Sequence, residues 1–181
     1  MNFKPFMRLL CHQKPERCYW MCREPLVVCS RCLGIYVGFL ITVIFSLFAF
    51  GLFTKTVNFI FAIVLLIPMG IDGVSQLLGK RESNNPLRFL TGYTAGYAVA
   101  LVFYSLVAKT LAFQTTGTIP NMLSIVPLLF TPVFILIFEK FSNSQILKKT
   151  FNFAAIFTAL FMVAAVFFLY AVVLRNFIAA Q

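Results

Sequence analysis

The sequence predicts an all-α integral membrane protein, a helical bundle of about five transmembrane helices. Of its 181 residues, 61% are hydrophobic and only 11% are charged, whereas a soluble domain carries about 25% charged residues. The apolar residues also form unbroken runs of about 20 residues, the length of helix that crosses a hydrocarbon core about 30 Å thick. Such runs are typical of transmembrane helices rather than of amphipathic helices in soluble proteins.

The candidate spans are five apolar runs separated by polar residues, over residues 33–53, 57–78, 87–111, 122–138 and 150–174. The fourth run is short and contains Pro127 and Pro132, so we expect it to be kinked. The polar stretch over residues 139–149 should form the loop that follows it. We therefore predict two parts, a cytoplasmic juxtamembrane segment over residues 1–32 and one transmembrane bundle over residues 33–181.

The third span carries two further signals. Pro86 suits its first helical position, with Asn85 as the cap. Gly92, Gly96 and Ala100 then recur at every fourth residue, a stripe of small residues that lets a neighbouring helix approach closely. The stripe is a packing signal and not a site.

Lysine and arginine are distributed unevenly between the two ends of the predicted spans. One end has Lys4, Arg8, Lys14, Arg17, Arg23, Arg31, Lys80, Arg81, Arg88, Lys140, Lys148 and Lys149, and the other has Lys55, Lys109 and Arg175. By the positive-inside rule the first end is cytoplasmic, which predicts a protein of the cytoplasmic (inner) cell membrane with its N-terminus in the cytoplasm. The same rule and anionic lipid headgroups explain the net charge of +10. We therefore expect membrane lipid, and no nucleic acid, as a partner.

Two polar residues interrupt the second span near its cytoplasmic end. Asp72 and Gln76 are spaced i, i+4 and therefore share one helix face. A charge within the membrane costs about 2.5–3.5 kcal/mol on insertion scales, so Asp72 needs a partner, for which Arg81 and Arg88 are candidates. The pair would either lock two helices together or belong to a site, in which Asp72 and Gln76 are the candidate catalytic residues.

A candidate anion site follows at the start of the third span. A helix N-terminus offers N–H groups and the positive end of a dipole, and arginine side chains bind phosphate or carboxylate in two-pronged fashion. The candidate anion-binding residues are Arg17, Arg31, Arg81, Ser83, Asn85 and Arg88. Ordinary helix capping, together with arginines that set the topology, explains the same pattern equally well.

All five cysteines and the only histidine lie between residues 11 and 32. Cytoplasmic cysteines rarely form structural disulfides, and the spacing and compartment favour a metal site, with zinc as the expected ion. The candidate ligands are Cys11, His12, Cys29 and Cys32. Because adjacent residues are awkward ligands for one ion, Cys18 or Cys22 could replace Cys11 or His12.

Two other interpretations of the cysteines remain open. Cys29 and Cys32 could form a redox pair, in which the helix dipole and Arg31 lower the pKa of a thiol. The cysteines could also be merely buried or acylated residues next to the membrane.

The motifs form one ordered series, C-H-Q-x-P-E-R at 11–17, C-x-R-C-x-G-I-Y-x-G at 29–38, D-G-x-x-Q at 72–76 and R-x-S-x-N-x-x-R-x-x-T-G at 81–92. The series resembles a family of small prokaryotic predicted multi-pass membrane proteins classed as a domain of unknown function. The resemblance covers roughly residues 8–100 and implies no established activity. It implies one site built from both polar clusters, with an essential set of Cys11, His12, Cys29 and Cys32 and with Cys18 and Cys22 as extras.

The leading functional hypothesis is metal-dependent binding or processing of an anionic amphiphile, such as a phospholipid or a polyprenyl phosphate. The metal would be a Lewis acid or a structural clamp, the arginines would hold the anion, and Asp72 would be a base or an orienting group. One alternative is a transporter or channel with Asp72 and Gln76 along its path. Another is a membrane thiol oxidoreductase that uses Cys29 and Cys32. The sequence does not decide whether the chain is an enzyme.

Overall fold

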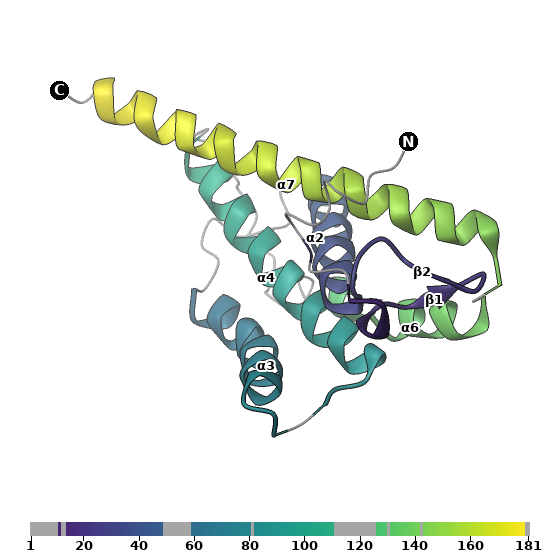
Figure 1. Ribbon diagram of the computed structural model, residues 1–181. Coiled ribbons are helices and arrows are strands. Elements are labelled where there is room, and N and C mark those ends of the chain that lie inside the picture. Colours follow the sequence, from purple (N-terminus) through teal and green to yellow (C-terminus); the bar gives the residue numbers. More distant parts are fainter. Residues whose placement is uncertain are drawn as a thin grey trace.

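The computed structural model describes residues 11, 14–48, 59–80, 82–110, 126–129, 131–141 and 143–179. Over these residues the chain is mostly helical, as predicted (Figure 1). The elements are η1 (Pro15–Arg17), β1 (Trp20–Met21), β2 (Glu24–Pro25), α2 (Ser30–Phe48), α3 (Phe59–Leu77), α4 (Asn85–Thr110), α5 (Val126–Leu129), α6 (Thr131–Lys140) and α7 (Gln145–Ala179).

Membrane-spanning potential is clearest in α7. Among the described residues, one helical stretch is long and apolar enough to cross a membrane on its own, Gln145–Phe168. Ser30–Phe45 in α2 and Phe61–Leu77 in α3 are apolar but shorter. Length and composition within the described ranges thus support one of the five predicted spans, and the number of spans stays a prediction.

The centre of the fold is a close contact between α2 and α4. A Cβ atom added at Gly92 would overlap the backbone carbonyl oxygen of Arg31, and one added at Gly96 would overlap that of Ile35. The pairing 31 with 92 and 35 with 96 means that the two helices run parallel. The glycines in the contact are Gly34 and Gly38 on α2 and Gly92 and Gly96 on α4. Small residues at every fourth position allow this approach, so the packing role predicted for the stripe on α4 is confirmed.

A short hairpin precedes α2, and the all-α prediction missed it. β1 and β2 pair antiparallel, and the two turn residues, Cys22 and Arg23, have positive φ angles of 53° and 61°. Two consecutive positive φ angles are the conformation of a type I′ turn, which usually carries Asn-Gly or another glycine pair. Neither residue gives that signal in the sequence.

The N-terminal segment packs into the helices rather than forming a separate unit. Cys18, Met21 and Leu26 are buried in one hydrophobic cluster with Phe89 of α4 and Phe151 of α7. Contacts with α7 hold the segment in place, because Val27 N–H donates to Asn152 Oδ1 at 3.1 Å and Glu24 forms an ion pair with Lys148. The segment and the helices therefore share one hydrophobic cluster, and α2 begins at Ser30.

In the described part of the predicted fourth span, each proline lies at a helix start, and the expected kink stays a prediction. Pro127 and Pro132 are the second residues of α5 and α6, respectively, and the first turn of a helix is where proline is tolerated. The loop predicted over residues 139–149 is also shorter than expected, since α6 ends at Lys140 and α7 begins at Gln145. Ser144 caps α7, because its Oγ accepts the N–H of Leu147 at 3.3 Å.

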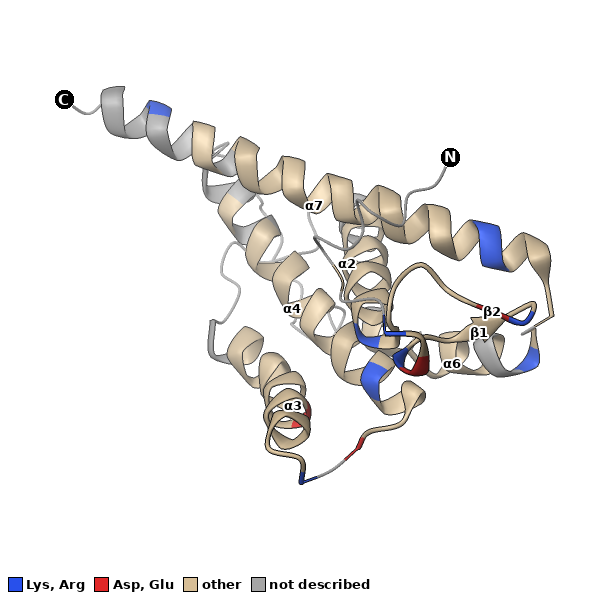
Figure 2. Ribbon diagram, in the orientation of Figure 1, with Lys and Arg blue, Asp and Glu red and all other residues tan. Residues whose placement is uncertain are grey.

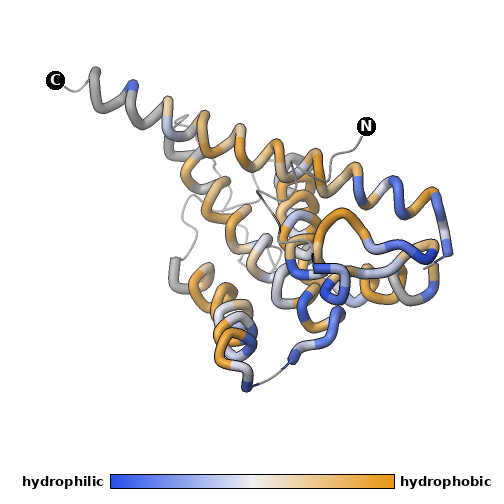
Figure 3. The backbone as a smooth tube through the Cα atoms, viewed as in Figure 1, coloured by the Kyte–Doolittle hydropathy of each residue, from blue (hydrophilic) through white to orange (hydrophobic). Residues whose placement is uncertain are grey.

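Charged and hydrophilic residues gather where α2 and α4 begin and α3 ends (Figures 2 and 3). The outward face of α3 is apolar instead, with Ile71 65% and Leu77 86% exposed. A contiguous apolar surface of this kind is uncommon on a soluble monomer. The fold therefore places a polar end beside an apolar helix face.

We expect Gly96→Leu to lower the free energy of unfolding by about 1–3 kcal/mol or more, because the new side chain would push α4 away from the backbone of α2. The measurement is unfolding in detergent, followed by circular dichroism. Gly70→Leu is the matched control, since a Cβ at Gly70 meets nothing within 4 Å. Equal losses in the two variants would contradict the close helix contact.

Candidate metal centre and polar network

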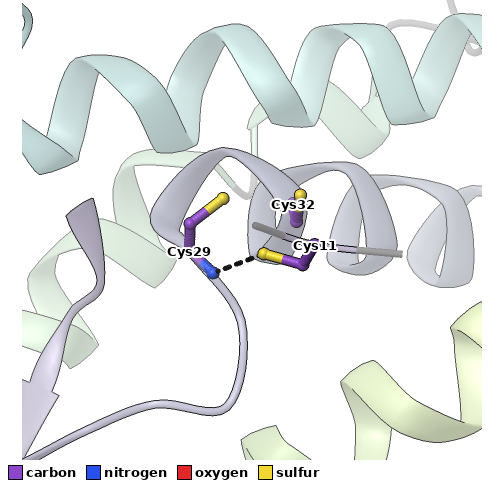
Figure 4. A group of neighbouring side chains, drawn as sticks. All are labelled: Cys11, Cys29 and Cys32. Atoms are coloured by element: carbon purple, nitrogen blue, oxygen red, sulfur yellow. Dashed lines mark hydrogen bonds between the residues drawn. The ribbon is translucent and has the colours of Figure 1, made fainter. Parts of the chain in front are cut away.

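Three cysteine thiols converge at the start of α2. The Sγ atoms of Cys11, Cys29 and Cys32 all lie within 4.8 Å of one another (Figure 4). Cys11 and Cys29 are buried, and Cys32 is partly exposed. The N–H of Cys29 donates to Cys11 Sγ at 3.2 Å, and a hydrogen bond of this kind favours the thiolate form of its acceptor.

The position of the helix start explains the convergence. Because α2 begins at Ser30, Cys29 immediately precedes it and Cys32 lies in its first turn. Residues three apart lie on one face of a helix. The hairpin of β1 and β2 reverses the chain, and this reversal returns Cys11 to Cys29 across 18 residues.

The set of three thiols fits a thiophilic metal ion such as zinc. Zn–S bonds of about 2.3 Å in tetrahedral geometry place two ligand sulfurs about 3.8 Å apart. The Sγ atoms of the cluster are at most 4.8 Å apart, and small side-chain rotations would shorten these separations to the value required. Three of the four predicted ligands are thus brought together, and the fourth, His12, lies outside the described residues.

The two remaining cysteines have partners of their own. Cys18 Sγ donates to a backbone carbonyl at 3.3 Å, and burial raises the pKa of its thiol to about 12, with further increments from the nearby cluster thiols. A thiol with that pKa is neutral at pH 7. Cys22 Sγ contacts the carbonyl oxygen of Asn143 at 3.2 Å. This arrangement agrees with the sorting implied by the family resemblance, in which both are extras.

The expected lowering of thiol pKa by the helix dipole and Arg31 is wrong for Cys29. Its pKa is raised, first because of its hydrogen bond with Cys11 and also through burial. The positive charge of Arg31 is compensated, since its guanidinium forms an ion pair with Asp72. Metal binding and thiol redox chemistry both require the thiolate, so this shift does not favour either, and the metal interpretation rests on the convergence of the three thiols.

A continuous chain of polar contacts joins α2, α3 and α4. Arg31 Nη2 donates to Asp72 Oδ2, and Gln76 Nε2 donates to Asp72 Oδ1 at 3.1 Å and also to Ser83 Oγ. Ser83 Oγ accepts a second hydrogen bond, from Arg88 Nε at 3.1 Å. The predicted meeting of the N-terminal segment with the end of the second span is therefore present as a hydrogen-bonded network.

Among the described residues, the partner of Asp72 is an arginine that was not predicted. It is Arg31, from the same Cys-x-Arg-Cys motif that carries the metal candidates, whereas Arg88 reaches Ser83 instead and Arg81 lies outside the described residues. The sequence could not identify this partner, because only the parallel contact of α2 with α4 determines which arginine faces α3. The ion pair also links helices, as the structural interpretation expected.

A pocket of about 350 Å³ opens at the start of α4. Its lining includes Glu16, Arg17, Glu82, Ser83, Asn85 and Arg88. Four of the predicted anion-binding residues therefore share one cavity, and Arg31 connects to it through Asp72, Gln76 and Ser83. The two glutamates were not predicted, although Glu16 belongs to the first motif.

The cap of α4 is Asn84 rather than the predicted Asn85. Asn84 Oδ1 accepts the N–H of Leu87 at 3.0 Å, and its carbonyl accepts the N–H of Arg88 at 3.1 Å. Because Pro86 has no N–H, the first turn keeps few free donors, and an anion in the pocket would depend on side chains. Because Asn84 is the cap, the Asn85 side chain is available for another contact, and its Nδ2 donates to the carbonyl of Cys18 at 3.1 Å.

We expect Asp72→Asn to lower the free energy of unfolding by about 1–3 kcal/mol, because Arg31 would lose its counter-charge next to the bilayer. A fully buried pair loses roughly 3–5 kcal/mol, and the 22% exposure of the Arg31 side chain reduces this value. Unfolding in detergent of both single variants and of Arg31→Gln/Asp72→Asn gives the coupling energy. Lys148→Gln, in the exposed pair with Glu24, should lose less than about 1 kcal/mol. Additive losses of Arg31→Gln and Asp72→Asn would contradict the pairing.

Comparisons with known proteins give a consistent result. A family model described as "Predicted membrane protein (DUF2085)" matches residues 11–102. An uncharacterised protein of Methanocaldococcus jannaschii is 46% identical over 99 residues, which are 54% of this chain and 62% of that protein. An uncharacterised protein of Methanothermobacter thermautotrophicus is 44% identical over 97 residues, 52% of this chain and 85% of that protein. No solved structure matches the chain.

The chain thus spans less than two thirds of the length of the first of these relatives. The range matched by the family model contains the three clustered thiols, the polar network and the pocket, and it ends within α4. α5, α6 and α7 lie beyond it. On this match over half of its length, the chain belongs to this family of predicted membrane proteins.

Proposed function

We propose that the protein is a multi-pass membrane protein that holds a metal ion next to a cleft for an anionic amphiphile. The ligands are Cys11, Cys29 and Cys32, with His12 as the expected fourth, and zinc is the expected ion. The observation that carries the proposal is the convergence of three Sγ atoms within 4.8 Å. The cytoplasmic side of the cell membrane is the proposed location of this end, on the distribution of lysine and arginine.

Exposed apolar residues on two helices support the multi-pass arrangement. α3 exposes Ile71 and Leu77, and α7 exposes Phe153, Phe167 and Tyr170. Contact of such surfaces with lipid tails has no free-energy cost, whereas their contact with water is unfavourable.

The metal is proposed as a structural clamp. A metal ion with all its positions occupied by protein ligands is typical of structural zinc sites, whereas catalytic sites keep an open position. Cys11 and Cys29 are buried, which favours the closed type. When bound, zinc would supply a fixed crosslink between the N-terminal segment and the first turn of α2, and with it the position of Arg31.

The polar network supports the binding of an anionic headgroup. Arg17 and Arg88 line the pocket, and both could contact a phosphate or carboxylate group. Asp72 acts as an orienting group rather than a base, because Arg31 and Gln76 occupy one carboxylate oxygen each. The apolar face of α3 beside the network gives the tails of an amphiphile a place to lie.

We expect about one zinc ion per chain in protein purified without chelators, measured by inductively coupled plasma mass spectrometry. Cys29→Ser/Cys32→Ser should lose it, because two of three thiolate ligands are gone. Cys22→Ser is the control, since this thiol contacts Asn143 outside the cluster, and it should keep the metal. Metal-free wild-type protein whose clustered thiols all react with iodoacetamide would refute the metal centre and make thiol redox chemistry the next hypothesis.

A further inference from the structure

Arg88 is a buried cation without a carboxylate partner. Only 7% of the residue is exposed, and the one hydrogen bond that its side chain makes to the described residues goes from Nε to the neutral Ser83 hydroxyl. The ion pairs formed by described side chains involve Arg31 and Lys148 instead. Arg88 lines the pocket, so its Nη groups are the donors that remain for a bound molecule.

Two other arginines add to the positive charge around Arg88. Arg17 and Arg31 are both close enough to act on it electrostatically, as are the negative groups of Asp72 and Glu82. Asp72 is already paired with Arg31. A buried charge requires a partner, and an anion bound between Arg17 and Arg88 would supply one.

The pocket also offers hydrogen-bond acceptors. Glu16 and Glu82 both belong to its lining, and carboxylate oxygens accept hydrogen bonds. The occupant of the pocket should therefore also carry a hydrogen-bond donor beside its anionic group.

We infer that this pocket binds a phosphoryl anion that carries a nearby O–H or N–H donor. The phosphoryl oxygens contact Arg88 and Arg17, and the donor reaches the carboxylate of Glu16 or Glu82. Glu16 and Glu82 at the same pocket suit a positively charged ammonium donor, as in a phosphoethanolamine headgroup. The volume of about 350 Å³ is at the lower end of ligand pockets, which fits a headgroup or a free phosphate and not a whole lipid.

This inference rests on the proposed function, because it names the chemical class of the amphiphile. The test uses the full chain in a maltoside detergent and measures binding by isothermal titration calorimetry. The probes are dihexanoyl phosphatidylethanolamine, dihexanoyl phosphatidylcholine and inorganic phosphate. The choline lipid has the same phosphodiester but no N–H donor, so it isolates the contribution of that donor.

The expected result is saturable binding of the ethanolamine lipid, about tenfold or more tighter than the choline lipid. Arg88→Gln should weaken it by about tenfold or more, as expected for the loss of one hydrogen bond to a charged group. Arg17→Gln, at a partly exposed position that a folded chain tolerates, should weaken it in the same direction. Lys80→Gln removes a charge from the neighbouring loop outside the pocket and should leave the affinity unchanged.

The outcomes separate the sources of the phosphoryl group. Inorganic phosphate that binds as tightly as the ethanolamine lipid, and is lost in Arg88→Gln, would support the site with a free anion as its ligand. Equal binding of both lipids that neither arginine substitution changes would overturn the inference, and so would absence of binding of all three probes. An equal loss in Lys80→Gln would also overturn it, by indicating general attraction to a basic surface.

The metal content of each variant distinguishes this inference from the proposed metal centre. Arg88→Gln should retain the metal while it loses the phosphoryl ligand. If Arg88→Gln loses anion binding and keeps its metal, the pocket is an anion site distinct from the cysteine cluster. A metal-free protein that still binds the ethanolamine lipid through Arg88 would leave this inference standing and refute the metal centre.

Discussion

The close approach of α2 and α4 over facing glycines positions the polar groups at the start of these two helices. Because a Cβ at Gly92 would overlap the carbonyl of Arg31, the first turn of α2 is pressed against the first part of α4. Its cysteines then turn toward the N-terminal segment, and Arg31 turns toward Asp72 on α3. Larger residues would separate the backbones, and the polar groups would then lose their partners.

The first turn of α2 connects two systems with different chemistry. Cys32 belongs to the thiol cluster, and Arg31, its neighbour, begins the chain of contacts that leads through Asp72, Gln76 and Ser83 to Arg88. A second connection runs from the N-terminal segment to α4 through the carbonyl of Cys18 and Asn85. An ion on the thiols would thus stabilise both walls of the pocket, which gives the metal a role without a catalytic step.

Sequence reasoning predicted the helical class, the packing role of Gly92 and Gly96, and a common location for the two polar clusters. The spacing of hydrophobic and small residues and the composition of each segment are enough for such predictions. It failed for the partner of Asp72 and for the cap of α4, because these depend on which of several nearby arginines and asparagines the tertiary contacts select. It also missed the hairpin, since Cys22 and Arg23 adopt positive φ angles without the usual glycine. The spacing of the cysteines and the family resemblance both favoured a cluster of Cys11, Cys29 and Cys32, and the hairpin is the physical reason for their proximity.

The metal centre is the central claim, and X-ray absorption spectroscopy at the zinc edge of the purified protein tests it most directly. The account predicts three sulfur scatterers at about 2.3 Å and one nitrogen at about 2.0–2.1 Å. A coordination shell of oxygen and nitrogen alone, or a protein with no metal absorption edge, would contradict it.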